Sequence, residues 1–130
     1  MQNRGAVGSD QIDQMQPAEF TSPQDPVAEV FQAVGEDRAL AARKLLGYLD
    51  SGLPPENVIR AARQLIFLKG DDSHDYKFSS AIMEDYHHIS PDWRNRFLAA
   101  STYQLRGSHE ATNGLVERIR HCLLYTSRCV

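Results

Sequence analysis

Residues 54–70 read PPENVIRAARQLIFLKG, and this stretch decides the fold class. Two prolines open it, and a missing backbone N–H does no harm in the first turn of a helix. A lysine and a glycine close it, as they do at many helix ends. We therefore predict a central helix over 54–69, because the apolar residues between these signals cover most of a helical wheel: Val58, Ile59, Ala61, Ala62, Leu65, Ile66, Phe67 and Leu68.

Helical spacing of apolar residues continues on both sides of this stretch. Ser90-Pro91 is a further start signal, because serine can cap free amides and proline fits the first helical turn. No segment alternates between apolar and polar residues as a strand does. We predict an all-α domain of antiparallel helical hairpins over residues 25–121. Its other helices are expected over 26–34, 36–50, 74–89, 91–106 and 109–121.

A weak internal similarity is visible when residues 49–70 are laid over residues 86–107. It aligns a proline near the start and a glycine at the end of both segments. Stacked helical hairpins commonly repeat at about 34–47 residues, so a solenoid-like arrangement is admissible. The shared start and stop residues of two unrelated helices could give the same matches, and both interpretations stay open.

Residues 1–24 have no helical or strand period and are rich in Gln, Asp, Ser, Gly and Pro. This composition is typical of disorder, so we predict a disordered N-terminal tail. The segment also lacks the basic and then apolar pattern of a secretory signal. A cytoplasmic location is therefore the default expectation.

The charge balance excludes two classes of partner. The chain has 130 residues, 14 basic and 17 acidic side chains, and a formal net charge of −3. Without basic runs, the sequence has no cluster of positive charge that would bind the phosphates of nucleic acid. The apolar runs fall far short of the about 20 residues that span a bilayer. We expect neither nucleic acid nor membrane as a partner, while a small-molecule substrate or a protein partner bound through sequence downstream stays open.

The last nine residues, CLLYTSRCV at 122–130, look unrelated to what precedes them. They can be encoded by TGT CTC TTA TAC ACA TCT AGA TGT GTA. The last three codons, extended by TAA GAG ACA, are the reverse complement of the first six. This inverted repeat resembles the transposase recognition end used to fragment DNA for sequencing libraries. We therefore interpret residues 122–130 as translated adapter and expect the natural protein to continue past His121. Both cysteines lie in this stretch, so no disulfide framework or zinc knuckle is predicted.

One cluster of polar residues could carry chemistry. Residues 72–78, DSHDYKF, place an imidazole, two carboxylates, a phenol and an amine at the start of a predicted helix. A histidine beside a carboxylate can bind metal or move a proton near neutral pH. His74, Asp75 and Lys77 are therefore the candidate catalytic residues. The acidic residues also suit a helix N-terminus, where they satisfy free amides, so a structural role stays open.

Three strings carry a resemblance to a known family: HDYKF at 74–78, SPDWR at 90–94 and LAAS at 98–101. They resemble large all-helical bacterial proteins that are similar to the questin-oxidase-like family. The resemblance covers about residues 36–121. It implies an NADPH-linked oxygenase that acts on an anthraquinone, with His74, Asp75 and Lys77 as candidate site residues, of which His74 and Lys77 line a pocket completed downstream.

Two functional interpretations follow. In the first, the chain is the N-terminal part of an oxidoreductase. In the second, it is a non-enzymatic helical-repeat module that binds a partner on its concave face, and the polar cluster only caps a helix. No nicotinamide-binding motif is present in the chain, so the sequence assigns no cofactor and no metal.

Overall fold

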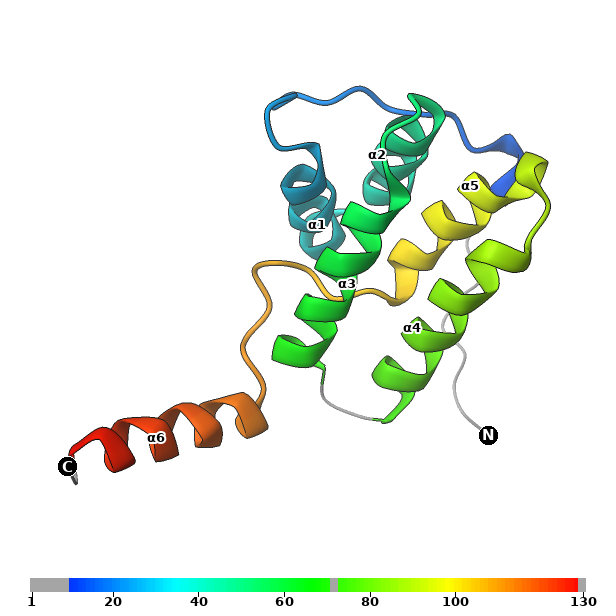
Figure 1. The fold of residues 1–130 in the computed structure, drawn as a ribbon. Helices are drawn as coiled ribbons and strands as arrows, with labels where there is room; N and C mark the ends of the chain where they lie inside the picture. The colour runs from blue at the N-terminus through cyan, green and yellow to red at the C-terminus, as the bar shows by residue number, and fades with distance from the viewer. Residues whose placement is uncertain (1–9, 71–72, 129–130) are drawn as a thin grey trace.

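The computed structural model describes residues 10–70 and 73–128, and only the backbone at positions 74, 78 and 125–128. All regular structure in this part of the chain is helical, which confirms the all-α fold class (Figure 1). The helices, with 3-10 helices marked η, are η1 Ile12–Gln14, α1 Pro26–Glu36, α2 Arg38–Asp50, α3 Pro55–Lys69, α4 Ser73–Asp85, η2 Tyr86–His88, α5 Pro91–Ala100, η3 Ser101–Gln104 and α6 Gly114–Arg128.

Local signals in the sequence explain where these helices begin. A proline stands in the first turn of α1, α3 and α5. The carboxylates of Asp25 and Asp37 cap α1 and α2 by accepting the amides of Ala28 and Leu40, both at 3.1 Å. Gly52, with φ of +77°, follows the end of α2. This left-handed conformation strains other residues, so the turn after α2 depends on a glycine.

The predicted helix over 91–106 is shorter than expected, because α5 changes to the tighter η3 after Ala100. The hydroxyls of Ser101 and Thr102 donate to the carbonyls of Leu98 and Ala99, at 2.5 and 2.9 Å. These bonds occupy acceptors in the last α-helical turn, as serine and threonine often do. Residues 86–107 therefore contain 3-10 turns on both sides of α5, whereas α3 in residues 49–70 is one continuous α-helix. Whether the two segments form a true repeat stays open.

The expected cap of the helix that starts at Pro91 is wrong. Ser90 makes no side-chain capping bond, and its backbone carbonyl instead accepts the amides of Trp93 and Arg94 at 3.0 Å. The Trp93 side chain is 50% exposed. The buried face of α5 is provided by Leu98 and Ala99 instead.

The core is centred on α2 and not on α3, which corrects the expectation from residues 54–69. Helix α2 packs against α1 and α5, and α3 packs against α4 (Figure 1). Side chains of α2 are almost fully enclosed, with Leu45 at 0% and Leu46 at 1% exposure. On α3 only one face is covered, so Val58 is buried while Phe67 is 55% exposed.

Residues 10–24, which we call the strap, run irregularly across the helices apart from η1 (Figure 1). The rest of the predicted disordered tail, residues 1–9, lies outside the described residues. The missing helical period of the strap was expected, but its position was not. Met15 and Phe20 pack against the hydrophobic core. The strap is thus part of the folded domain.

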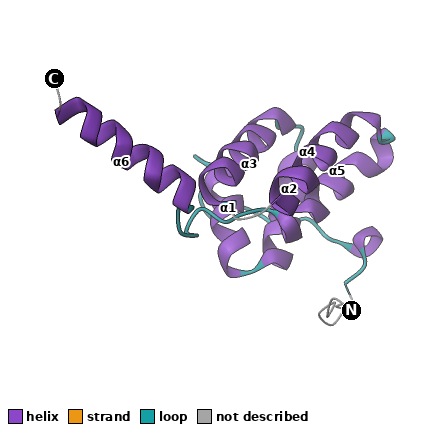
Figure 2. Ribbon diagram, turned by 90° about the horizontal axis from the view of Figure 1, so that it is seen from below, coloured by secondary structure: helices purple, strands orange, loops and turns teal. Residues whose placement is uncertain are grey.

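Helix α6 extends away from the other helices (Figures 1 and 2). Its first turn is attached, because Val116 is buried, whereas Leu115 is 50% and Ile119 44% exposed. The helix continues through the suspected adapter, where Leu123 and Leu124 are each 64% exposed. Among the described residues, no helix is long and apolar enough to cross a membrane.

Deleting residues 122–130 should change the free energy of unfolding by less than about 1 kcal/mol, the size of an ordinary substitution. The reason is that Leu123 and Leu124 are mostly exposed on a projecting helix. Urea unfolding followed by circular dichroism, for the whole and the shortened chain, measures the difference. A larger loss on deletion would show that this segment packs against the domain.

Candidate functional site

The three candidate residues lie at the start of α4, beside the end of α3 and the loop that follows η3. There Asp75 and Arg106 form an ion pair, with Oδ2 and Nη2 2.5 Å apart. The other arm of Arg106 binds Glu110, with Nη1 and Oε2 3.0 Å apart. The hydrogen bond with Asp75 raises the pKa of Arg106 despite burial, which lowers it, and Glu110 raises it further. The guanidinium therefore holds both carboxylates in place.

The structure describes the side chains of two of the three candidates, Asp75 and Lys77. Lys77 is exposed to solvent, while Asp75 is half-buried and faces Arg106. His74 lies in the first turn of α4, and its side chain is outside the described part of the structure. Over residues 10–70 and 73–128, no three described His, Cys, Asp or Glu side chains are grouped to hold a metal ion. Asp75 thus has a visible structural role in joining α4 to the loop.

The start of α4, the end of α3 and the loop after η3 meet at one place, which we call the junction. Asn113 belongs to this junction, and the sequence analysis did not identify it. Its Nδ2 donates to the carbonyls of Phe67 and Gly70, at 2.9 and 3.0 Å, at the end of α3. Its Oδ1 accepts the amide of Val116 at 3.0 Å and so caps α6. An asparagine just before a helical stretch is a common capping residue, and this signal could have revealed half of its role.

Replacing Asn113 with alanine should lower the free energy of unfolding by about 2 kcal/mol. Carbonyls at the end of α3 would lose their donor in a buried setting, and α6 would lose its cap. Asn113→Ser is the matched control, because serine keeps an oxygen that can cap α6 and lacks the Nδ2 donor without adding charge, so its loss should be smaller. Urea denaturation measures both variants. Equal stability of Asn113→Ala and the wild type would contradict the role of the junction.

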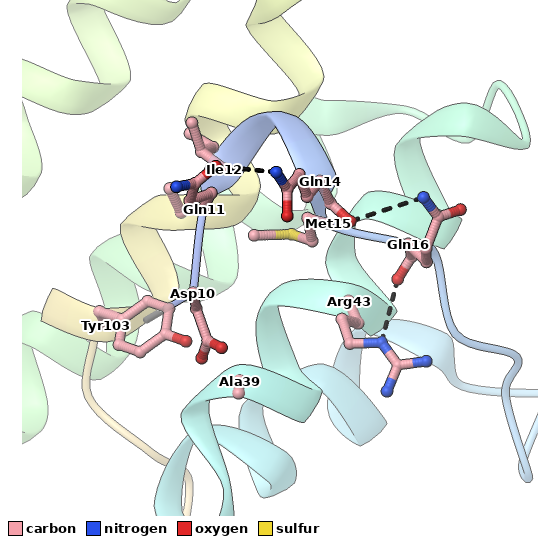
Figure 3. A pocket seen from close by; sticks show the side chains of 10 residues that line it. Asp10, Gln11, Ile12, Gln14, Met15, Gln16, Ala39, Arg43 and Tyr103 are labelled. Atoms are coloured by element: carbon pink, nitrogen blue, oxygen red, sulfur yellow. Dashed lines mark hydrogen bonds between the residues drawn. The ribbon is translucent and has the colours of Figure 1, made fainter. Parts of the chain in front are cut away.

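A separate cavity of about 660 Å³ lies between the strap and the helices (Figure 3). We call it the strap pocket. Strap residues 10–12 and 14–16 form one wall. Ala39 and Arg43 of α2, Ala100 of α5 and Tyr103 of η3 form the other. Its volume is within the usual range for sites that bind small molecules.

Opposite charges occupy opposite sides of the strap pocket. Asp10 and Tyr103 lie on one side and Arg43 on the other (Figure 3). Burial raises the pKa of Tyr103, and the Asp10 carboxylate raises it further by its charge and by accepting a hydrogen bond. The phenol therefore keeps its proton at neutral pH. Arg43 donates from Nε to the carbonyl of Gln16 at 3.0 Å, which fixes the guanidinium.

The lining of the strap pocket offers several kinds of group that can bind a ligand. Among its ten lining residues there is no cysteine, histidine, serine or lysine. A phenol that stays protonated cannot serve as a base. The pocket can offer an anion, a cation, hydrogen-bonding amides and apolar surface.

No family model, curated protein or solved structure matches this chain in the comparisons. The resemblance to the questin-oxidase-like family is therefore still a prediction.

Proposed function

We propose that the chain is a non-enzymatic helical module that binds a small, partly polar ligand in the strap pocket. The observation that carries this proposal is that the strap is fastened to the helices around the pocket. Arg96 of α5 donates from Nη1 to the carbonyls of Ile12 and Met15, at 2.9 and 2.8 Å. Sites for small ligands are usually preformed in this way, because rigid walls reduce the entropy lost on binding.

The other end of the strap is held against α2 in the same manner. The amide of Ala18 donates to the carbonyl of Arg43 at 2.9 Å. Gly47 of α2 lies next to this contact. A Cβ atom at Gly47 would come within 2.6 Å of the carbonyl oxygen of Ala18. The absent side chain lets the strap backbone pack on the helix. A main-chain contact therefore holds the strap next to the pocket, in addition to the arginine side chains.

The polar cluster at α4 supports binding over turnover. An oxidoreductase site would need His74, Asp75 and Lys77 to face one cavity. Asp75 is engaged by Arg106, and Lys77 is exposed. A carboxylate held by a guanidinium that also binds Glu110 fits a structural role that joins two elements. We expect His74→Ala to leave any turnover unchanged, and loss of turnover without loss of stability would favour the oxidoreductase instead.

Ligand-observed NMR with a mixture of small amines, carboxylates and amides tests the proposal. The variant Ala100→Leu adds bulk inside the pocket, and Ala81→Leu adds the same bulk to an exposed position on α4. We expect at least one compound to bind the wild type and Ala81→Leu, and to bind Ala100→Leu at least tenfold more weakly. The absence of binding to the wild type, or equal binding to Ala100→Leu, would overturn the proposal.

A further inference from the structure

We infer that the ligand of the strap pocket is a short peptide with free termini. Its ammonium group would bind Asp10, its carboxylate would bind Arg43, and an apolar side chain would lie between them. This inference rests on the proposed function of the pocket and adds the chemical class of the ligand. Three properties of the lining point to such a peptide. They are an anion on one side, a cation on the other, and both apolar and amide groups between them.

The anionic side of the pocket fits an ammonium group. The Asp10 carboxylate interacts with the protonated Tyr103 phenol and is otherwise exposed. A carboxylate has about four acceptor positions, so several are open to a ligand. An ammonium group brings three donors and a compensating charge, and charge-assisted hydrogen bonds are about twice as strong as neutral ones.

The cationic side fits a carboxylate. Arg43 uses Nε for the bond to Gln16, and neither of its Nη atoms makes a hydrogen bond within the part of the chain that the structure describes. The planar guanidinium can therefore present both Nη groups to one carboxylate, and its bond to the strap fixes the plane. Lysine at this position would offer a point charge without that geometry.

The middle of the pocket has the mixed character of a peptide. Ile12, Met15 and Ala39 provide apolar surface. Gln14 donates from Nε2 to Oε1 of Gln11 at 2.9 Å, so its own Oε1 can accept a peptide N–H. The Gln14 side chain points from η1 towards the space between Asp10 and Arg43 (Figure 3). A simple diamine or fatty acid would leave one charged side and this amide unused.

Calorimetry with the tripeptide Ala-Leu-Ala tests this inference. The free peptide is compared with its N-acetylated and C-amidated forms, which have nearly the same shape and each lack one terminal charge. We expect each blocked peptide to bind the wild-type chain at least tenfold more weakly than the free one. Asp10→Asn should weaken the free peptide and abolish the difference between the free and the acetylated forms.

Asp13→Asn is the matched control, because Asp13 is an exposed strap carboxylate that does not line the pocket. It should preserve the affinity for the free peptide. If blocked and free peptides bind alike, or if Asp13→Asn and Asp10→Asn behave alike, the recognition of termini is wrong. If no peptide binds while the mixture of small compounds does, the ligand class is wrong and the proposed function stands. If neither binds, both fail.

Discussion

Replacing Glu29 with glutamine is expected to lower the free energy of unfolding by about 3 kcal/mol at pH 7, as for other buried ion pairs that lose one partner. Glu29 binds the ammonium of Lys44 and accepts hydrogen bonds from Thr21 and Ser22, the amides at 2.9 and 2.8 Å. The side chains of Lys44 and Glu29 are only 10% and 9% exposed. Glutamine would leave the ammonium buried without an anion and would loosen the strap.

The same variant should respond differently to acid. Burial alone would raise the pKa of Glu29, but Lys44 and the bonds from Thr21 and Ser22 outweigh it and lower the pKa from 4.5 to about 2. Because the carboxylate binds its proton less readily when folded, its stabilisation is complete above about pH 4.5. It is lost as the pH falls towards 2. The stability difference between wild type and Glu29→Gln should therefore shrink across this range.

Urea unfolding at pH 7, 4.5 and 2.5, followed by circular dichroism, measures this effect. Glu36→Gln is the control, since Glu36 is an exposed glutamate on the same helix α1. It should change stability little at any of these pH values. A constant difference between wild type and Glu29→Gln from pH 7 to 2.5 would show that the ion pair with Lys44 is not what stabilises this region.

Replacing Leu45 with alanine should lower the free energy of unfolding by about 3–4 kcal/mol. Leu45 is fully buried on α2, which has α1 on one side and α5 on the other. The neighbours of α2 are held by their own packing, so the cavity left by the missing atoms would close only in part. Chemical denaturation at pH 7 measures the loss.

Two further leucines make this prediction a test of where the core is centred. Leu65 on α3 is half-buried, and Leu53 in the preceding loop is 40% exposed. We expect the losses on alanine substitution to fall in the order Leu45, Leu65, Leu53, with less than about 1 kcal/mol for the last. A greater loss for Leu65 than for Leu45 would support the original prediction that the helix over residues 54–69 is the centre of the core.

Helix positions could be predicted because their signals act over short distances. A proline in the first turn, or an aspartate such as Asp37 that caps its own helix, works within three or four residues. Apolar spacing likewise reports one face of one helix. The change at Ser101 and Thr102 was missed because two hydroxyls, and not a glycine or proline, tightened the helix.

The candidate site could not be predicted in the same way. The string at 74–78 drew attention to His74, Asp75 and Lys77, yet the partner of Asp75 is 31 residues further along the chain. No local rule selects Arg106 among the 14 basic residues. The polar string lies at the start of α4, and its contact with the loop after η3 depends on a residue that is distant in sequence.

The sequence by itself determined that residues 10–70 and 73–128 form helices and no strands, because the signals for helices follow from the backbone geometry of neighbouring residues. Only the tertiary structure decided that α2 is central and that the strap closes a pocket. Its anchors join Arg43 to Gln16 across 27 positions and Arg96 to Met15 across 81. Contacts between such distant residues form when whole helices pack, so no periodicity along the chain records them.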